Sequence, residues 1–250
     1  MTTPTDDSPV VLVTGAARRI GAQIARLQHE AGWRVLVHAR HSSDEAAALV
    51  EALCVARAGS ASLLIADLAD PAAIAALAHD AHRIWGRLDA LVNNASSYFP
   101  TPVGSIEAAQ LDDLLASNLR APLLLTQACR PHFAPGAAVV NIIDTQTPRP
   151  QPPHSAYFAA KAGLWSLTES LAVELAPQIR VNGVAPGHMM WALAGGVEGE
   201  AEQARELARI PLGRLGGAIE IARAVRFLLS DDAAYITGAI LPVDGGLRLS

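Results

Sequence analysis

Short apolar runs alternate with longer helix-like stretches along almost the whole of this 250-residue chain. Most of the runs are continuously apolar, as expected of parallel strands that helices cover on both faces. Because strands separated by helices imply right-handed crossovers, the pattern predicts an α/β chain with a doubly wound, seven-stranded parallel sheet. The expected strands span residues 10–14, 35–38, 62–67, 90–94, 137–143, 181–185 and 239–242. The expected helices span residues 21–31, 44–58, 71–86, 111–130, 155–176 and 219–229.

The pattern runs on without an internal repeat, a low-complexity linker or a second domain, so we expect one domain over residues 1–250. Residues 1–9 are polar and acidic, and we expect them to be flexible. Residues 188–210 fit the alternation poorly. They are rich in glycine and charge, which suits a mobile lid over a substrate site.

Composition and charge exclude several classes of partner. The net charge of -5 leaves no basic surface of the kind that binds nucleic acid. Cys54 and Cys129 lie far apart without metal-type spacing, which indicates reduced thiols and no metal site. The N-terminus lacks the apolar core of a signal peptide, and no apolar run approaches a membrane span. We therefore expect a soluble, cytoplasmic protein with no membrane partner.

The first expected strand leads into a glycine-containing loop, Thr14-Gly15-Ala-Ala-Arg18-Arg19-Ile20-Gly21. Gly15 permits a tight turn, Gly21 permits close helix packing, and the helix N-terminus offers N–H groups to a pyrophosphate. Taken alone, such a loop is also compatible with a purely structural turn. Its place between a strand and a helix favours a Rossmann-type dinucleotide site, with contacts from Gly15, Arg18, Arg19 and Ile20.

Two arginines carry information about the ligand. Arg19 adds a fixed positive charge that can bind phosphate or reach a bound substrate; the alternative is a solvated side chain on the first helical turn. After the second strand, NAD-binding loops place an acid for the ribose hydroxyls, but here no acid occurs before Asp44. Arg40, supported by His41 and Ser42, would pair with a 2′-phosphate, which favours NADPH. The alternative is that Arg40 faces solvent.

Further cofactor contacts are expected where later strands end. Asp67 is placed to hydrogen-bond the adenine amino group, and it also fits a helix N-cap-like position ahead of Pro71. Backbone and amide groups after the fourth strand are placed to line the ribose and nicotinamide. The expected contacts in these connections are Asp67, Leu68, Asn94, Ala95, Pro186 and Gly187.

A catalytic pair is expected on the helix over residues 155–176. Tyr157 and Lys161 are spaced i and i+4, so their side chains share one face. A nearby ammonium favours the phenolate, and we expect Lys161 to lower the pKa of Tyr157 toward working pH, making it a usable general acid. Lys161 would also hold the nicotinamide ribose. Asn118 is placed to position a water that links Lys161 to solvent.

Asp144 lies thirteen positions before Tyr157, at the end of an apolar strand. Its carboxylate can accept hydrogen bonds from a ring N–H or amino group, or pass a proton to Tyr157. The alternative is a turn residue in a degenerate, inactive chain. Because the other catalytic positions are intact, we interpret Asp144 as an acid in direct contact with the substrate site.

Residues 14–21, residues 93–102, Asp144 and the Tyr157-x-x-x-Lys161 pair together resemble the pteridine reductases. These enzymes, with the related dihydromonapterin reductases, are a branch of the short-chain dehydrogenase/reductase superfamily. Most members of the superfamily have a serine at the position of Asp144 and a glycine at that of Arg19. The resemblance covers nearly the whole chain.

The resemblance implies an NADPH-dependent enzyme that reduces a dihydropterin, and in some relatives folate, to the tetrahydro level. It implies that Ser96 meets the cofactor phosphates and the substrate, that Tyr98 stacks on the pterin ring, and that Arg19 reaches it. Tyr157, supplied with protons by Asp144, would protonate a ring nitrogen. The resemblance also implies a homotetramer that uses the helices over residues 111–130 and 155–176 as interfaces.

Two segments depart from the family pattern and leave the substrate open. Residues 145–153 are unusually rich in proline, and residues 188–191 replace the usual residues after Pro186-Gly187. Trp191 is expected either to cap the pocket or only to pack within the lid. One alternative is an NADPH-dependent reductase of a non-pterin carbonyl or imine. Another is a redox-sensing NADP-binding module without turnover, although such modules usually lose the catalytic Tyr or Lys.

Overall fold

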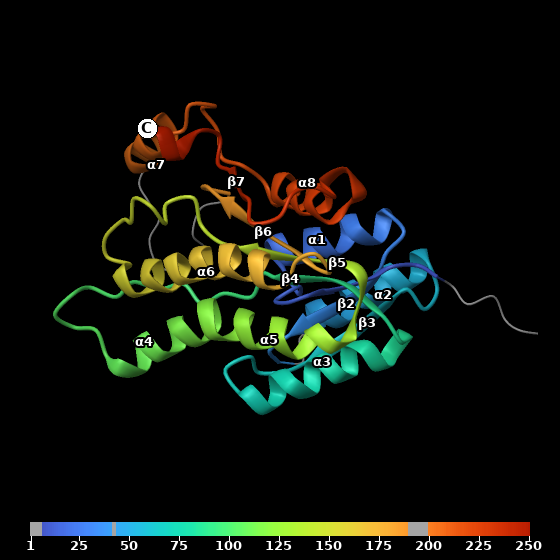
Figure 1. The fold of residues 1–250 in the computed structure, drawn as a ribbon. Helices are drawn as coiled ribbons and strands as arrows, with labels where there is room; N and C mark the ends of the chain where they lie inside the picture. The colour runs from blue at the N-terminus through green and yellow to red at the C-terminus, as the bar shows by residue number, and fades with distance from the viewer. Residues whose placement is uncertain (1–6, 42–43, 190–199) are drawn as a thin grey trace, which may run out of the picture.

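Seven strands form one parallel sheet in the order β3-β2-β1-β4-β5-β6-β7 (Figure 1). The computed structural model describes residues 7–41, 44–189 and 200–250. The expected α/β, Rossmann-type fold with a seven-stranded parallel sheet is confirmed. The strands are β1 (Val10–Val13), β2 (Arg34–Ala39), β3 (Ala61–Ile65), β4 (Leu88–Asn93), β5 (Phe133–Ile142), β6 (Arg180–Pro186) and β7 (Ile240–Val243).

Helices cover both faces of this sheet (Figure 1). Helices α1 (Arg19–Glu30), α2 (Asp44–Ala56) and α8 (Ala218–Leu229) contribute to the apolar core on one face. Helices α3 (Pro71–Trp85), α5 (Ala121–Cys129) and α6 (Ser155–Glu174) contribute to the core on the other. Helix α4 (Ala108–Leu115) precedes α5 in the chain, and α7 (Glu200–Ala208) lies between β6 and α8. Short 3-10 turns span Arg130–His132, Asp231–Ala233 and Leu247–Leu249.

The continuously apolar strands are explained by these two cores. In β1, Val11 and Val13 join the core under α1 and α8, whereas Val10 and Leu12 join the opposite one. Successive side chains of a strand point to opposite faces, so a strand covered on both sides needs an apolar residue at every position.

Three elements differ from the expectation. The helix expected over residues 111–130 is α4 and α5 joined by a π-helix over Ala116–Arg120. Strand β5 begins at Phe133, four residues before the expected strand, and its pairing with β4 shifts in register between Leu88 and Ala90. Within the expected lid, residues 200–208 form α7, a helix that the glycine-rich sequence before it had obscured.

The strand order reverses at β1, which pairs with β2 on one side and β4 on the other. In doubly wound sheets, ligands bind outside the carboxyl ends of the strands at such a switch point. The connections that follow β1 to β6 all leave the sheet at this edge, and they carry the residues singled out by the sequence.

Within the described residues, no helix is both long and apolar enough to cross a membrane. The same residues hold no group of three or more His, Cys, Asp or Glu side chains suited to a metal ion. Cys54 and Cys129 are free thiols, and burial raises the pKa of Cys129 to about 12.

Candidate active site

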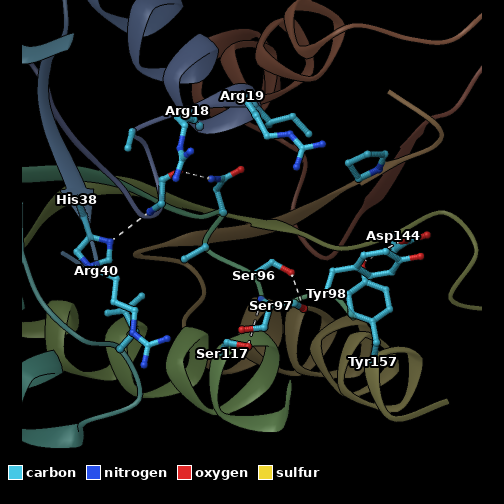
Figure 2. Close-up of a pocket in the computed structure, with 18 of the residues that line it drawn as sticks. Arg18, Arg19, His38, Arg40, Ser96, Ser97, Tyr98, Ser117, Asp144 and Tyr157 are labelled. Atoms are coloured by element: carbon cyan, nitrogen blue, oxygen red, sulfur yellow. Dashed lines mark hydrogen bonds between the residues drawn. The ribbon is translucent and has the colours of Figure 1, made fainter. Parts of the chain in front are cut away.

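A cavity of about 730 Å³ opens at the carboxyl edge of the sheet. Its volume lies in the range of small-molecule sites, roughly 300–1,000 Å³. Figure 2 shows His38 and Arg40 at one end and Tyr98, Asp144 and Tyr157 at the other. The lining includes most of the predicted site residues: Gly15, Arg18, Arg19, Ile20, Arg40, His41, Asp67, Leu68, Asn94, Ala95, Ser96, Tyr98, Asp144, Tyr157, Pro186 and Gly187.

Some predicted positions do not line this cavity. Ser42, Trp191 and the part of the expected lid over residues 190–199 lie outside the described residues, as do residues 1–6 of the expected flexible N-terminus. Asn118 and Lys161 are described but buried behind the lining.

The turn after β1, residues 14–21, packs tightly against the connection that follows β4. The Thr14 hydroxyl accepts hydrogen bonds from the amides of Asn94 (2.9 Å) and Ala95 (3.0 Å). Gly15 has φ +61°, and a Cβ there would lie 2.9 Å from Ala95 Cα. A Cβ on Gly21 would lie 2.4 Å from the Gly15 carbonyl. The turn therefore requires both glycines, and it fits a pyrophosphate held at the N-terminus of α1.

Arg19 is the one non-glycine residue of the described chain with a positive φ, at 54°. Residues other than glycine are strained in this left-handed region, and such strain concentrates at functional sites. Arg18 and Arg19 both extend from the start of α1 along the edge of the cavity (Figure 2). The Arg18 guanidinium lies 3.6 Å from the carboxylate of Glu45 in α2.

At the far end of the cavity, Arg40 forms an ion pair with Asp67 at 3.0 Å. Asp67 also accepts a hydrogen bond from the Ala69 amide at 2.9 Å, and this bond, with the charge of Arg40, lowers the pKa of its carboxyl. The N-cap of α3 is Asp70, whose side chain accepts from the Ala72 amide. The N-cap-like interpretation of Asp67 is therefore wrong.

At the other end, the Tyr157 hydroxyl donates a hydrogen bond to Asp144 Oδ2 at 3.0 Å. The other carboxyl oxygen, Oδ1, accepts from the Gln146 amide at 2.8 Å. Asp144 follows β5 and Tyr157 lies in the first turn of α6, so the fold joins two residues that the sequence related only by spacing. Burial raises the pKa of Asp144, which favours a protonated, proton-donating carboxyl.

The expectation that the pKa of Tyr157 is lowered is wrong in direction. Burial and the neighbouring Asp144 carboxyl raise the pKa of Tyr157 well above its ordinary value. Lys161 is itself buried, which lowers its pKa to about 8, and its ammonium donates to the Ile142 carbonyl at 2.9 Å. Its Nζ lies 5.7 Å from the centre of the Tyr157 ring. Tyr157 is thus held as a neutral phenol, and Asp144 is the acid bonded to it.

Asn118 lies in the π-helix, where its side chain is engaged by its own surroundings. Its amide nitrogen donates to the carbonyls of Ser97 (2.9 Å) and Leu114 (3.0 Å), and its oxygen accepts from Ser96 Oγ at 2.6 Å. These bonds brace the connection after β4 against α4. The water-mediated path from Asn118 to Lys161 therefore stays a prediction.

Tyr98, the aromatic residue expected to stack on the substrate, stacks on another side chain in this structure. The Tyr98 ring lies parallel to the imidazole of His154, with a centroid distance of 4.5 Å, and edge-on to Tyr157 at 4.8 Å. Tyr98 remains 59% exposed, so a flat ligand has access to part of it.

The lining residues that sequence reasoning missed include His38, Gln146 and His188. Gln146 and His188 lie 3.0 Å apart through their Nε2 atoms, and His188 Nδ1 lies 3.6 Å from a carboxylate oxygen of Glu206 in α7. His38 is buried near the carboxyl end of β2, between the apolar residues Val37 and Ala39. A polar residue within an apolar strand was a signal for His38, whereas Gln146 and His188 lie in loops with no such signal.

Comparison with known proteins places the chain among reductases. A family model described as "Enoyl-(Acyl carrier protein) reductase" matches residues 15–248. The chain is 36% identical to pteridine reductase 1 of Leishmania tarentolae, covering 100% of this chain and 99% of that protein. It is 34% identical to a 3-oxoacyl-[acyl-carrier-protein] reductase of Staphylococcus aureus, covering 95% and 97%. It is 35% identical to an uncharacterized oxidoreductase of Methylorubrum extorquens, covering 97% and 98%.

Proposed function

The chain belongs to the short-chain dehydrogenase/reductase superfamily, an NAD(P)-dependent oxidoreductase family, and from that membership we propose that it is an NADPH-dependent reductase of a dihydropterin. The observation that carries the proposal is the partly buried Asp144 carboxyl bonded to the Tyr157 hydroxyl. A hydroxyl at this position would serve a ketone oxygen, whereas a carboxyl suits a substrate with ring N–H and amino groups.

The residues around Asp144 support the same substrate class. Arg19 offers a charged donor along the cavity, and the exposed part of Tyr98 offers an aromatic surface for a flat heterocycle. The similarity to a pteridine reductase extends over the full chain. Pterin specificity is thus supported by three side chains and by one relative.

In the mechanism that we propose, residues 14–21 and Arg40 would hold NADPH, which would supply a hydride for a pterin ring carbon. Tyr157 donates its proton to the neighbouring ring nitrogen, and Asp144 returns a proton to the phenol through the hydrogen bond of 3.0 Å. Burial raises the pKa of Asp144, and in its protonated form this carboxyl can return a proton to Tyr157 without a transient phenolate facing an ionised carboxylate. Lys161 contributes positive charge behind the phenol, and to hold the cofactor ribose as expected its ammonium would have to extend from the Ile142 carbonyl into the cavity.

For the cofactor, we infer NADPH from Arg40 and the absence of an acid at the end of β2. Arg40 must exchange Asp67 for the 2′-phosphate when NADPH binds. We expect Arg40→Ala to raise the KM for NADPH by about tenfold, the value of one charge-assisted contact, and to change the KM for NADH far less. Equal effects on both would show that Arg40 does not bind the 2′-phosphate.

A second candidate is reduction of a non-pterin carbonyl or imine. The similarity to a 3-oxoacyl-[acyl-carrier-protein] reductase favours it, since that relative is almost as similar over nearly the same length. A redox-sensing module without turnover is disfavoured, because Tyr157 and Lys161 are both in place. A Tyr157→Phe variant that kept its biological role would revive that alternative.

The direct test is NADPH oxidation with dihydrobiopterin, dihydromonapterin and dihydrofolate beside simple ketones and a 3-oxoacyl thioester. We expect turnover with at least one pterin and none with the ketones or the thioester. Turnover of carbonyl compounds without turnover of pterins would support an oxidoreductase activity but contradict the proposed pterin substrate. Cytoplasmic location and a homotetramer remain part of the same proposal, the first supported by the two free thiols.

A further inference from the structure

His38 is a buried histidine directly beneath the turn over residues 14–21. Its side chain is 1% exposed although it lies in β2, whose neighbouring positions are apolar. Figure 2 shows its ring at the end of the cavity, bonded to the backbone of the turn. Neither the catalytic mechanism nor the 2′-phosphate contact uses this side chain.

The hydrogen bonds of His38 define which ring nitrogen carries the proton. Nε2 lies 3.0 Å from the Ala66 carbonyl, which can only accept, so Nε2 must be protonated. Nδ1 accepts from the Gly15 amide at 3.2 Å, so Nδ1 must be unprotonated. Both contacts are satisfied together only by the neutral ring with its proton on Nε2.

The same residue also holds the turn through its backbone. The His38 carbonyl accepts from the Ala16 amide at 2.9 Å, so two successive amides of the turn bond to one residue. On the opposite side, Gly15 packs against Ala95, where a Cβ would have no room. The position of Gly15 is therefore set by His38 below and by Ala95 beside it.

We propose that His38 is a positioning residue of the cofactor site, whose neutral ring holds residues 14–21 in the conformation that binds the pyrophosphate. Protonation of Nδ1 would turn its N–H toward the Gly15 N–H, placing donor against donor. The turn would then be displaced and the affinity for the cofactor would fall. This inference concerns cofactor binding alone and holds whichever substrate the enzyme reduces.

The surroundings keep the neutral ring dominant near neutrality. Burial lowers the pKa of His38, while the Ala66 carbonyl and the Asp67 carboxylate oppose that shift. Other charged or titratable groups of the cavity lining are Arg18 and Arg19 from the turn and Arg40 and His41 from the end of β2. The pKa of His38 in the folded protein lies below 6.5. The hydrogen bond from the Gly15 amide to Nδ1 is therefore intact above pH 6.5, and it is lost as the pH falls through the pKa of the folded protein.

The test is the dissociation constant of NADP⁺, measured by calorimetry without substrate between about pH 8 and about pH 5. The variants are His38→Asn, whose Oδ1 can accept from the Gly15 amide without titrating, and His38→Gln, whose amide can keep only the Ala66 contact. Since the ligand and all residues other than position 38 are the same in the three proteins, ratios of their dissociation constants isolate the effect of His38.

We expect the ratio of wild-type to His38→Asn dissociation constants to rise about tenfold toward acid, the value of one lost backbone contact. His38→Gln should bind more weakly than His38→Asn at neutral pH, without that extra acid dependence. A constant ratio between wild type and His38→Asn, or equal losses in both variants, would overturn the proposal.

A measurement on the wild-type protein tests the same proposal even if the variants do not fold. Nitrogen-15 NMR of histidine-labelled protein reports which ring nitrogen carries the proton. The proposal predicts a buried ring protonated on Nε2 that gains a second proton over the pH range where NADP⁺ affinity falls. A ring protonated on Nδ1, or titration outside that range, would contradict it.

Discussion

Arg19 combines backbone strain with a charged group at the ligand cavity. Arg19→Gly should relieve the left-handed strain and raise the free energy of unfolding by about 0.5–1 kcal/mol, after the entropy cost of glycine. The same change should raise the KM of substrate or cofactor by about tenfold through loss of a charged donor. Urea unfolding and steady-state kinetics measure the two effects.

Arg18→Gly is the matched control, because Arg18 has φ -143° and no such strain to relieve. It should not gain stability. If both glycine variants lose the same amount of stability, the backbone of Arg19 is not strained, which would contradict the prediction.

Residue identities at the site were largely predictable, but their ionisation was not. Tyr157, Lys161 and Asp144 could be related from spacing alone. The direction of the Tyr157 pKa depends on burial and on which charge is nearer, and both are properties of the folded chain. The tautomer of His38 likewise depends on partners from two other connections.

At the scale of elements, the close contact between α1 and the turn before it is set by Gly21. A Cβ at this position would lie 2.4 Å from the Gly15 carbonyl and 2.6 Å from Asn94 Nδ2. Gly21→Ala should therefore lower the free energy of unfolding by about 1–3 kcal/mol, as overpacking does. It should also weaken NADP⁺ binding, measured by calorimetry.

Arg26→Ala on the exposed side of α1 is the control and should change neither quantity appreciably. NADP⁺ affinity that is equal in Gly21→Ala and Arg26→Ala would show that the turn tolerates displacement.

The strands could be predicted more completely than the helices. Mostly apolar runs identified all seven strands, because burial on both faces favours apolar residues at most positions of the inner strands. The π-helix over Ala116–Arg120 was not predicted, since such single widened turns are rare within helices and the pattern over residues 111–130 predicts one α-helix. Helix α7 was obscured by the glycine and charge that precede it.

At the scale of the whole molecule, the helices proposed as tetramer interfaces carry exposed apolar side chains. Val173 on α6 is 81% exposed, and Leu111 on α4 and Leu123 on α5 are each 37% exposed. We expect light scattering to give a mass four times that of the 26.1-kDa chain. Val173→Glu should reduce this mass, because a carboxylate would be desolvated in the interface.

Val55→Glu is the matched control, since Val55 is 82% exposed on α2, which covers the opposite face of the sheet. It should leave the mass unchanged. A wild-type mass equal to that of one chain would reject the tetramer.

The central claim is that Asp144 supplies the proton that Tyr157 delivers, and the pH profile of pterin reduction in wild type and Asp144→Asn tests it most directly. Burial raises the pKa of Asp144, so its acid form is present below that raised pKa and is lost as the pH rises through it. We predict that wild-type kcat falls with rising pH, and that Asp144→Asn lowers kcat by about 100-fold and removes this dependence. An Asp144→Asn enzyme with wild-type kcat and an unchanged pH profile would contradict the account.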